Sequence, residues 1–467
     1  MTLIKSISGI RGTIGGSPGE GLTPLDIVKF TAAYGMWVKK QKGKKVIVGR
    51  DARVSGKMVN YLVCATLQGM GLDVLDLGLS TTPTVELAVP LEKAGGGIIL
   101  TASHNPKQWN ALKLLNNKGE FISASDGAAI LDMADAGQLE FAPVEKLGHY
   151  KSDHDYLSKH IKMVKKHPFV DVKAIRKAKF KIVVDAVNSS GGIAVPELLD
   201  QLGVKKVKKL YCEPTGIFPH NPEPLPEHLK EISNKVKKGK YDLGIVVDPD
   251  VDRLALISED GSAFGEEYTL VAVADYYLKR KKGNAVSNLS STRALRDVTE
   301  NNGGKYYASA VGEVNVVTEM KRVKAVIGGE GNGGIIVPDF HYGRDALIGI
   351  ALFLTHLAKS GKKMSELKNS YPSYFISKNK IELTPDLDVD DIIEQISNGY
   401  SGENISKIDG VKINFEKDKE WVHLRKSNTE PIIRIYAESQ TEKKAKILAE
   451  RIIADIKKIS STKSLAS

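Results

Sequence analysis

Short apolar runs recur along the chain, and each ends in a loop rich in glycine and polar residues. The runs are Val46–Val48, Gly97–Leu100, Phe180–Val184, Leu243–Val247 and Ala325–Ile327. They are short and do not alternate with polar positions, which is typical of strands buried on both faces of a sheet. Segments with helical spacing lie between them. The pattern therefore predicts an α/β chain.

Two helices have the clearest boundaries. One is expected from Pro24 to about Lys40, because Thr23 can cap it and Pro24 suits the first helical position. The other is expected from Asp345 to about Lys359. In open α/β sheets, ligands collect where strands end, and the polar loops lie at such ends. We therefore expect these loops to converge on one cleft.

Polar and turn-forming stretches divide the chain. They lie at His149–Lys166, at Ser258–Gly261 and at Ser370–Pro372. Four segments follow, residues 1–150, 151–258, 259–370 and 371–467. The last differs from the others, because residues 388–399, strand-like runs at 412–415, 421–425 and 432–437, and a closing helix from Thr441 predict an α+β domain.

Composition narrows the class of protein. The 467 residues are 42% hydrophobic and 26% charged with 43 Gly, which excludes disorder, collagen and a membrane bundle. No apolar run reaches the roughly 18–20 residues that span a bilayer, and no secretory leader is apparent, so a cytoplasmic location is expected. Cys64 and Cys212 are expected to be ordinary thiols.

The net charge of +11 is compatible with binding to nucleic acid, to a membrane surface or to an anionic small substrate. The lysine runs are interpreted as solvated surface.

The segment Asp248–Arg253 has a carboxylate at every second position. Asp248, Asp250 and Asp252 would repel one another strongly without a cation, and hard divalent ions prefer such oxygen ligands. An EF-hand is excluded, because Arg253 takes the place of the required glycine and strands flank the loop. Mg²⁺ fits better. A solvated acidic turn is the alternative.

A serine lies in the turn Thr101–Pro106, after a glycine-rich strand. Ser103 could act as a nucleophile, with His104 and Lys113 as proton carriers. The alternative is an Asn-Pro turn whose polar side chains are satisfied locally. A serine hydrolase is not indicated, because the Gly-x-Ser-x-Gly pattern is missing.

Two further loops contain polar groups that could bind a ligand. Residues 425–431 with Arg434 combine guanidinium groups, hydroxyls and backbone N–H groups that suit a phosphate, the alternative being a solvated turn. The run Gly328–Gly334 lacks a dinucleotide-binding register and contains Glu330 and Asn332. A carboxylate and an amide on such a flexible loop suit sugar hydroxyls.

Together these motifs resemble the α-D-phosphohexomutase superfamily. Six motifs occur in the order of that family, namely Gly9–Gly12, Gly49–Gly56, Thr101–Pro106, Asp248–Arg253, Gly328–Gly334 and Arg425–Arg434. The resemblance implies three related mixed α/β domains and a C-terminal TBP-like α+β domain around a central cleft. It also implies interconversion of hexose 6-phosphate and hexose 1-phosphate through a phosphoserine and a bisphosphorylated sugar.

The resemblance implies roles for individual residues. Ser103 would carry the phosphoryl group. Mg²⁺, one per chain, would be bound by Asp248, Asp250, Asp252 and an oxygen of phosphorylated Ser103. The side chains expected around the phosphoserine are Arg11, His104, Lys113 and Arg253, with Lys113 as general acid/base. Glu330 and Asn332 would bind sugar hydroxyls, and the non-reacting phosphate would be held by Arg425, Ser427, Asn428, Thr429 and Arg434.

Departures from the family pattern bear on the sugar. Many bacterial members have Ser at the position of Asn332 and His at that of Gly334, and the form found here is more similar to archaeal and some other prokaryotic sequences. Val311-Gly312-Glu313 is nearer the Val-Gly-Asp of phosphoglucosamine mutases than the Val-Gly-His of phosphomannomutase/phosphoglucomutase members. Glu313 would favour an amino group, so glucosamine phosphate is expected, with mannose or glucose phosphate as the alternative.

Two other classes of function were considered. A sugar-phosphate-binding protein without turnover is disfavoured by the intact Ser103, Lys113 and three aspartates. A nucleic-acid binder is disfavoured because no helix-turn-helix, zinc-finger or RNP motif occurs and only 6% of residues are aromatic. The expected partners are a hexose phosphate and, as activator, a hexose 1,6-bisphosphate, with no nucleic acid and no membrane. A monomer or homodimer is expected.

Overall fold

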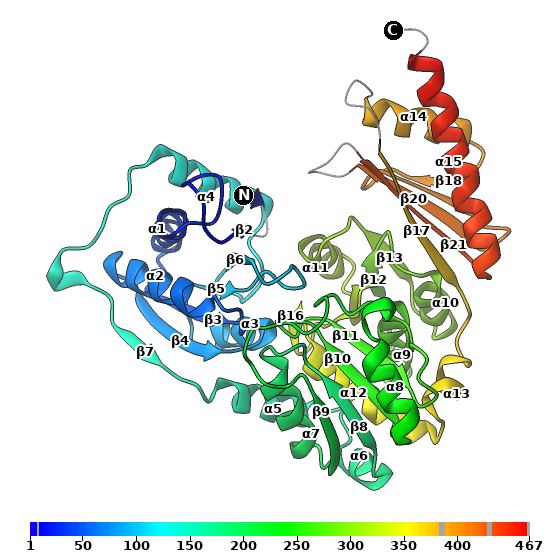
Figure 1. Ribbon diagram of the computed structural model, residues 1–467, viewed down its shortest axis with the longest axis horizontal. Coiled ribbons are helices and arrows are strands. Elements are labelled where there is room, and N and C mark those ends of the chain that lie inside the picture. Colours follow the sequence, from blue (N-terminus) through cyan, green and yellow to red (C-terminus); the bar gives the residue numbers. More distant parts are fainter. Residues whose placement is uncertain (7–8, 383–387, 427–431, 465–467) are drawn as a thin grey trace. The chain divides into compact units, whose positions relative to one another are not determined.

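The computed structural model describes residues 1–6, 9–382, 388–426 and 432–464 (Figure 1). The chain forms two compact units. Unit 1 comprises residues 1–280 and 332–368, and unit 2 comprises residues 281–331 and 369–467. Among the described residues, no helix is long and apolar enough to cross a membrane. The four-segment division at 150, 258 and 370 stays a prediction.

The first part of unit 1 is a seven-stranded mixed sheet with the order β1-β2-β6-β5-β3-β4-β7. Strand β3 is parallel to its neighbours β4 and β5, whereas β2 and β6 are antiparallel to each other. The elements are β1 (Leu3–Ser6), β2 (Gly9–Thr13), α1 (Pro24–Lys40), β3 (Lys45–Arg50), α2 (Gly56–Gly69), β4 (Asp73–Leu79), α3 (Thr82–Leu91), β5 (Gly96–Leu100), β6 (Trp109–Leu115), α4 (Ala124–Ala136) and β7 (Tyr150–Ser152).

Strand β3 shows why its apolar run does not alternate. Val46 and Val48 belong to the hydrophobic cluster that also includes side chains of α1, α2 and α4. Ile47, on the opposite face, belongs to a second cluster with side chains of α3. Both faces of the strand are therefore covered, as predicted. Helix α1 begins after Thr23, which accepts from the backbone N–H of Asp26, and this confirms the expected helix start.

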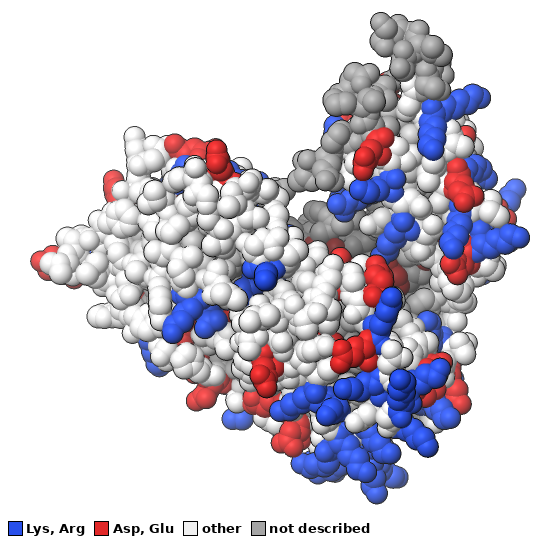
Figure 2. All heavy atoms as spheres, in the orientation of Figure 1, with Lys and Arg blue, Asp and Glu red and all other residues white. Residues whose placement is uncertain are grey.

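A four-stranded sheet follows in unit 1, with the order β11-β10-β8-β9. Its elements are α5 (Tyr156–Lys166), α6 (Val172–Ala178), β8 (Lys181–Asp185), α7 (Gly191–Gln201), β9 (Lys206–Leu210), α8 (Lys230–Gly239), β10 (Leu243–Val247), β11 (Leu254–Ser258) and α9 (Glu266–Leu278). Lys and Arg crowd over the part that holds β8, β9 and α8 (Figure 2). Lys206, Lys208 and Lys209 lie in the edge strand β9, where charged side chains oppose pairing with another chain.

Unit 1 ends with a hairpin and a buried helix. These elements are β15 (Gly334–Val337), β16 (His341–Arg344), α12 (Ala346–Ser360) and α13 (Met364–Lys368). Asp345 caps α12 through its carboxylate, which accepts from the backbone N–H of Leu347 at 2.7 Å. The helix expected from Asp345 to Lys359 is thereby confirmed.

Unit 2 has two parts. In the first, β12 (Ala285–Asn288) pairs in parallel with β13 (Tyr306–Ser309) and β14 (Ile327–Glu330), and the helices are α10 (Arg293–Asn301) and α11 (Glu313–Arg322). The second is an antiparallel sheet with the order β17-β21-β20-β19-β18 and a core shared with α14 and α15. Its elements are β17 (Phe375–Glu382), α14 (Val389–Gly399), β18 (Asn404–Ser406), β19 (Val411–Phe415), β20 (Glu420–Lys426), β21 (Ile432–Ser439) and α15 (Glu442–Ser464).

Candidate functional site

Ser103 lies in the loop between β5 and β6, and its side chain is buried. The backbone there is left-handed, with φ of 48°, a conformation that costs a residue other than glycine about 1–2 kcal/mol. The turn is held because the Ser103 N–H donates to Thr101 Oγ1 at 2.9 Å and the Thr101 hydroxyl donates to Asp51 at 2.7 Å. The Ser103 hydroxyl donates to Asp248 Oδ2 at 2.8 Å. The serine is thus held facing the aspartate loop.

Arg53 organises the serine loop, a role that the sequence analysis missed. Its buried guanidinium donates to four backbone carbonyls of this loop, those of Ser103, Asn105, Pro106 and Trp109. The Arg53 Nε–H donates to Asp51 at 3.0 Å. All five N–H donors of the side chain are therefore used. The Asp-x-Arg spacing at the end of β3 was visible in the sequence, but nothing local shows which carbonyls it binds.

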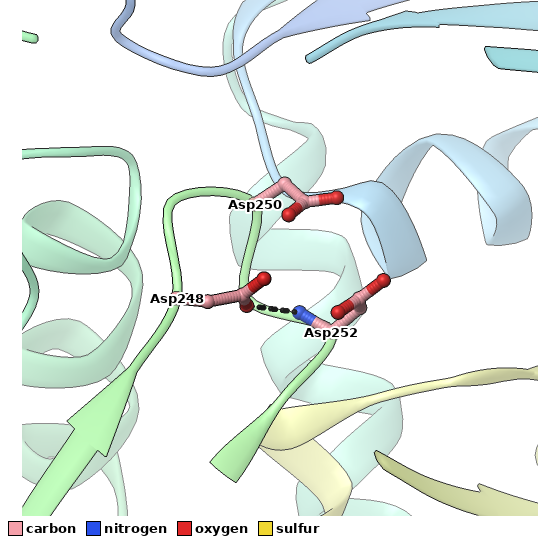
Figure 3. Close-up of side chains that lie close together, drawn as sticks. All are labelled: Asp248, Asp250 and Asp252. Atoms are coloured by element: carbon pink, nitrogen blue, oxygen red, sulfur yellow. Dashed lines mark hydrogen bonds between the residues drawn. The ribbon is translucent and has the colours of Figure 1, made fainter. Parts of the chain in front are cut away.

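The three aspartates lie in the loop between the antiparallel strands β10 and β11, as Figure 3 shows. All are buried, and one oxygen of each lies within 4.8 Å of the others. Asp248 Oδ1 accepts from the backbone N–H groups of Asp252 and Arg253 at 3.2 and 3.1 Å, which fixes the turn. Burial, and then Asp252 and Asp250, raise the pKa of Asp248 well above its usual value. Such a cluster calls for a cation.

The donor set fits a hard divalent ion. Asp250 Oδ1 and Asp252 Oδ1 are buried and have no hydrogen-bond partner among the described residues. Carboxylate oxygens are the ligands that Mg²⁺ prefers, and it usually binds one or two of them together with water or phosphate oxygens. The strands on both sides also confirm that the loop is no EF-hand. The three residues could therefore hold a metal.

Cationic and hydroxyl groups take up the other carboxylate oxygens. Lys113 Nζ donates to Asp250 Oδ2 at 2.7 Å and lies 3.7 Å from Asp252 Oδ2. Burial alone would lower the pKa of Lys113, but Asp250 and Asp252 raise it above its usual value. The Thr82 hydroxyl donates to Asp250 at 2.6 Å, and Arg344 donates to Asp252 at 2.6 Å. Thr82 and Arg344 had not been expected, because they come from other elements, α3 and β16.

The remaining expected cations of unit 1 surround the serine loop. Arg11, on β2, donates to the Asn105 side chain at 2.8 Å. His104 Nδ1 lies 3.4 Å from Ser103 Oγ, and burial, followed by Arg253 and Arg11, lowers the pKa of His104 to about 2. Arg253 Nη1 is 3.7 Å from Glu223. The structure thus brings together the seven residues that were expected around the phosphoserine and metal, in addition to Ser103.

The expected sugar-binding residues fall on both sides of the unit boundary. Glu330 lies in unit 2 and Asn332 in unit 1. The expectation of a flexible Gly328–Gly334 loop is wrong, because β14 continues to Glu330 and β15 begins at Gly334. Glu330 is buried, and its Oε1 accepts from Asn288 Nδ2 at 2.9 Å and from the Gly312 N–H at 3.2 Å. Asn332 Oδ1 accepts from the Gly334 N–H at 3.2 Å.

Glu313 and the two phosphate-loop arginines also lie in unit 2. Glu313 is buried at the start of α11, beside the loop that Glu330 holds. Arg425 on β20 and Arg434 on β21 are paired directly in the antiparallel register. Like charges opposite each other destabilise a sheet, so this pair favours an anion between them. Ser427, Asn428 and Thr429 lie outside the described residues.

Comparison with known domain families covers most of the chain. Residues 3–140, 158–261 and 265–374 match the phosphoglucomutase/phosphomannomutase alpha/beta/alpha domains I, II and III, and residues 380–455 match the C-terminal domain of the same proteins. The chain belongs to the phosphoglucomutase/phosphomannomutase family. It is therefore a phosphohexomutase, an enzyme of the isomerase class, and the resemblance inferred from the six motifs is confirmed.

Two curated relatives of this family span nearly the whole chain. A phosphoglucomutase/phosphomannomutase from Thermococcus kodakarensis is 36% identical and covers 93% of this chain and 95% of its own. A protein named "Probable phosphoglucosamine mutase" from Methanopyrus kandleri is 32% identical, with 96% of each chain covered. A solved structure of a family protein from Burkholderia thailandensis has a TM-score of 0.82 at 24% identity, covering 97% of each chain, which shows the shared fold.

Proposed function

We propose that this phosphohexomutase acts on glucosamine phosphate through a phosphoserine at Ser103. The observation that carries the phosphoserine is the hydrogen bond of 2.8 Å from the buried Ser103 hydroxyl to Asp248 in the aspartate cluster. The sugar preference is supported by Glu313, whose carboxylate can attract an ammonium group, and by the name of the relative from Methanopyrus kandleri. The relative from Thermococcus kodakarensis supports mannose or glucose phosphate as the alternative.

The proposed reaction consists of two phosphoryl transfers, each of a different phosphoryl group. In the first, a free sugar hydroxyl attacks the phosphorus of phosphorylated Ser103, the bond from phosphorus to Ser103 Oγ breaks, and the hydroxyl proton passes to Ser103 Oγ. The product is a sugar 1,6-bisphosphate. In the second, Ser103 Oγ attacks the phosphorus of the other phosphate, the bond from that phosphorus to the sugar oxygen breaks, and the serine proton passes to the sugar oxygen. This restores the phosphoserine and leaves the isomeric monophosphate. Lys113, within reach of this cluster, is the proposed proton carrier.

Several groups hold the reactants in place. Asp248, Asp250, Asp252 and an oxygen of phosphorylated Ser103 would bind one Mg²⁺, which when bound neutralises charge on the transferring phosphoryl group. Arg53 and Thr101 hold the serine loop, Arg11 and Arg253 add positive charge around it, and His104 adds a neutral hydrogen-bonding ring. The chain's own contribution is thus positioning and electrostatic stabilisation.

A second set of residues is proposed to hold the sugar and its non-reacting phosphate. Arg425 and Arg434 supply paired guanidinium groups, with Ser427, Asn428 and Thr429 of the same loop. Glu330 and Asn332 are proposed to bind sugar hydroxyls, and Glu313 the amino group. Because Ser103 must be phosphorylated before turnover and a hexose 1,6-bisphosphate can donate that phosphoryl group, such a bisphosphate is the proposed activator.

The test is a steady-state comparison of glucosamine, glucose and mannose phosphates, primed with glucose 1,6-bisphosphate. We expect kcat/KM to be highest for glucosamine phosphate. Glu313→Gln should reduce that preference by about tenfold, equivalent to about 1.4 kcal/mol, and leave glucose phosphate unchanged. A higher kcat/KM for mannose or glucose phosphate would overturn the sugar assignment, whereas tight binding without turnover of any sugar would mean a non-catalytic binding protein.

A further inference from the structure

Asp409 contacts both proposed substrate-binding loops of unit 2. Its Oδ2 accepts from the backbone N–H of Val311 at 2.9 Å. The same oxygen lies 2.9 Å from Nε of Arg425, the arginine proposed to bind the non-reacting phosphate. One carboxylate thus joins the start of the Val311–Glu313 loop to the guanidinium on β20. Neither contact was apparent from the sequence, because Asp409 is distant from both loops in the chain.

The turn that carries Asp409 is itself fixed. Its backbone carbonyl accepts from His423 Nε2 at 2.7 Å, and Nδ1 of the same ring lies 2.9 Å from the Ser290 hydroxyl. Burial is the main reason that the pKa of His423 is lowered to about 4, which keeps the ring neutral and suited to both bonds. Next to Asp409, Gly410 has φ of 64°, and a Cβ there would lie 2.1 Å from the Leu424 carbonyl oxygen. These contacts hold the backbone of the turn, whereas the Asp409 carboxylate is positioned by its own contacts with Val311 and Arg425.

The Val311–Glu313 loop depends on two carboxylates. Asp409 accepts from the Val311 N–H, and Glu330 accepts from the next N–H, that of Gly312, at 3.2 Å. Gly312 has φ of 114° and precedes α11, which begins with Glu313. The loop is thus held through its backbone, and its path sets where the Glu313 side chain starts.

The contact with Arg425 is an ion pair rather than a hydrogen bond, because the buried Arg425 Nε has no hydrogen-bond partner among the described residues although Asp409 Oδ2 lies close to it. A guanidinium has two edges that can each bind an oxyanion, one containing Nε and the other formed by the two Nη groups. A carboxylate at Nε leaves the Nη edge for a phosphate, for which bidentate binding is favoured. The ion pair therefore ties the Arg425 guanidinium to Asp409 and, through the Val311 N–H, connects that arginine to the sugar loop.

We propose that Asp409 is a positioning residue that makes discrimination between sugars depend on the bound phosphate. The inference rests on the proposed roles of Arg425 and Glu313. When a phosphate fixes Arg425, Asp409 is fixed with it, and the Val311 N–H is held more firmly. The sugar loop is then ordered by the part of the substrate that does not react.

Two substitutions separate the contributions of Asp409. Asp409→Asn keeps an oxygen that can accept from Val311 but loses the charge beside Arg425, so KM should rise about threefold or more for all three sugar phosphates and discrimination between them should fall in part. Asp409→Ala loses both contacts, so KM should rise and discrimination should fall about tenfold. The matched control is Asp390→Asn. It removes an exposed ion pair of 2.8 Å with Lys426, which follows Arg425 on β20, and it should change neither KM nor the discrimination between sugars.

A second measurement does not depend on turnover. Amide hydrogen exchange of the peptide around Val311 is measured with and without inorganic phosphate. Phosphate should slow exchange in the wild-type protein and in Asp390→Asn, and should have no effect in Asp409→Ala. Equal slowing in Asp409→Ala, or discrimination retained in that variant, overturns the inference even if the mutase activity stands. Phosphate-dependent slowing in a protein that turns over no sugar would instead contradict the proposed function and leave the coupling intact.

Discussion

Replacing Arg53 by Lys should both destabilise the serine loop and slow the reaction. The guanidinium donates to four carbonyls and one carboxylate, whereas an ammonium has three N–H groups. At least two buried acceptors therefore lose their donor. Hydrogen bonds to charged groups contribute about 1.5–3 kcal/mol each, so the free energy of unfolding should fall by about 3–6 kcal/mol.

The assay combines urea unfolding, followed by circular dichroism, with steady-state kinetics. We expect a lower unfolding midpoint and a kcat reduced at least tenfold with KM little changed, because Arg53 holds the Ser103 loop and not the sugar. Arg50→Lys is the matched control, since Arg50 lies in the same segment and donates to one carbonyl at 3.1 Å. Wild-type stability and kcat in Arg53→Lys would refute this reasoning.

Three further predictions concern the metal, its arginine neighbour and pH. Asp252→Asn should weaken Mg²⁺ binding, measured by titration calorimetry, at least tenfold. Asp260→Asn, in the exposed turn after β11, should leave the affinity unchanged. Equal affinities of the two variants would show that Asp252 does not bind the metal. Arg344→Met should lower kcat, because it removes the bond of 2.6 Å to Asp252, and an unchanged kcat would show that this bond is dispensable. Between pH 6.5 and 4, His423 binds more protons in the unfolded than in the folded chain, since its folded pKa is about 4. The free energy of unfolding should therefore fall by up to about 3 kcal/mol as pH drops through this window, and less in His423→Gln. Urea midpoints at pH 7 and 4.5 that shift equally in both proteins would disprove this.

The strands and the two capped helices could be predicted because their causes are local. Thr23 and Asp345 cap their helices with their own side chains, and the run around Ile47 is apolar because both faces of β3 are covered. The joining of Ser103 and Asp248, 145 positions apart, followed from the general rule that polar loops gather where strands end.

The glycines near Glu330 were misinterpreted for a physical reason. A glycine run predicts flexibility, but a Cβ at Gly328 would lie 2.7 Å from the Val286 carbonyl oxygen of β12 and 2.7 Å from the Met320 sulfur. That glycine allows close packing within a strand. Arg53 and Asp409 were missed for a related reason, since the loops that they hold are bound through backbone groups, which any sequence supplies and only the fold selects.

The central claim is that Ser103 carries the phosphoryl group. Its most direct test is intact-mass analysis and peptide mapping of the wild-type protein after incubation with glucose 1,6-bisphosphate and Mg²⁺. We expect one phosphoryl group, on Ser103, and neither that group nor mutase turnover in Ser103→Ala. Full turnover in Ser103→Ala, or a phosphoryl group on another residue of the active wild-type enzyme, would contradict it.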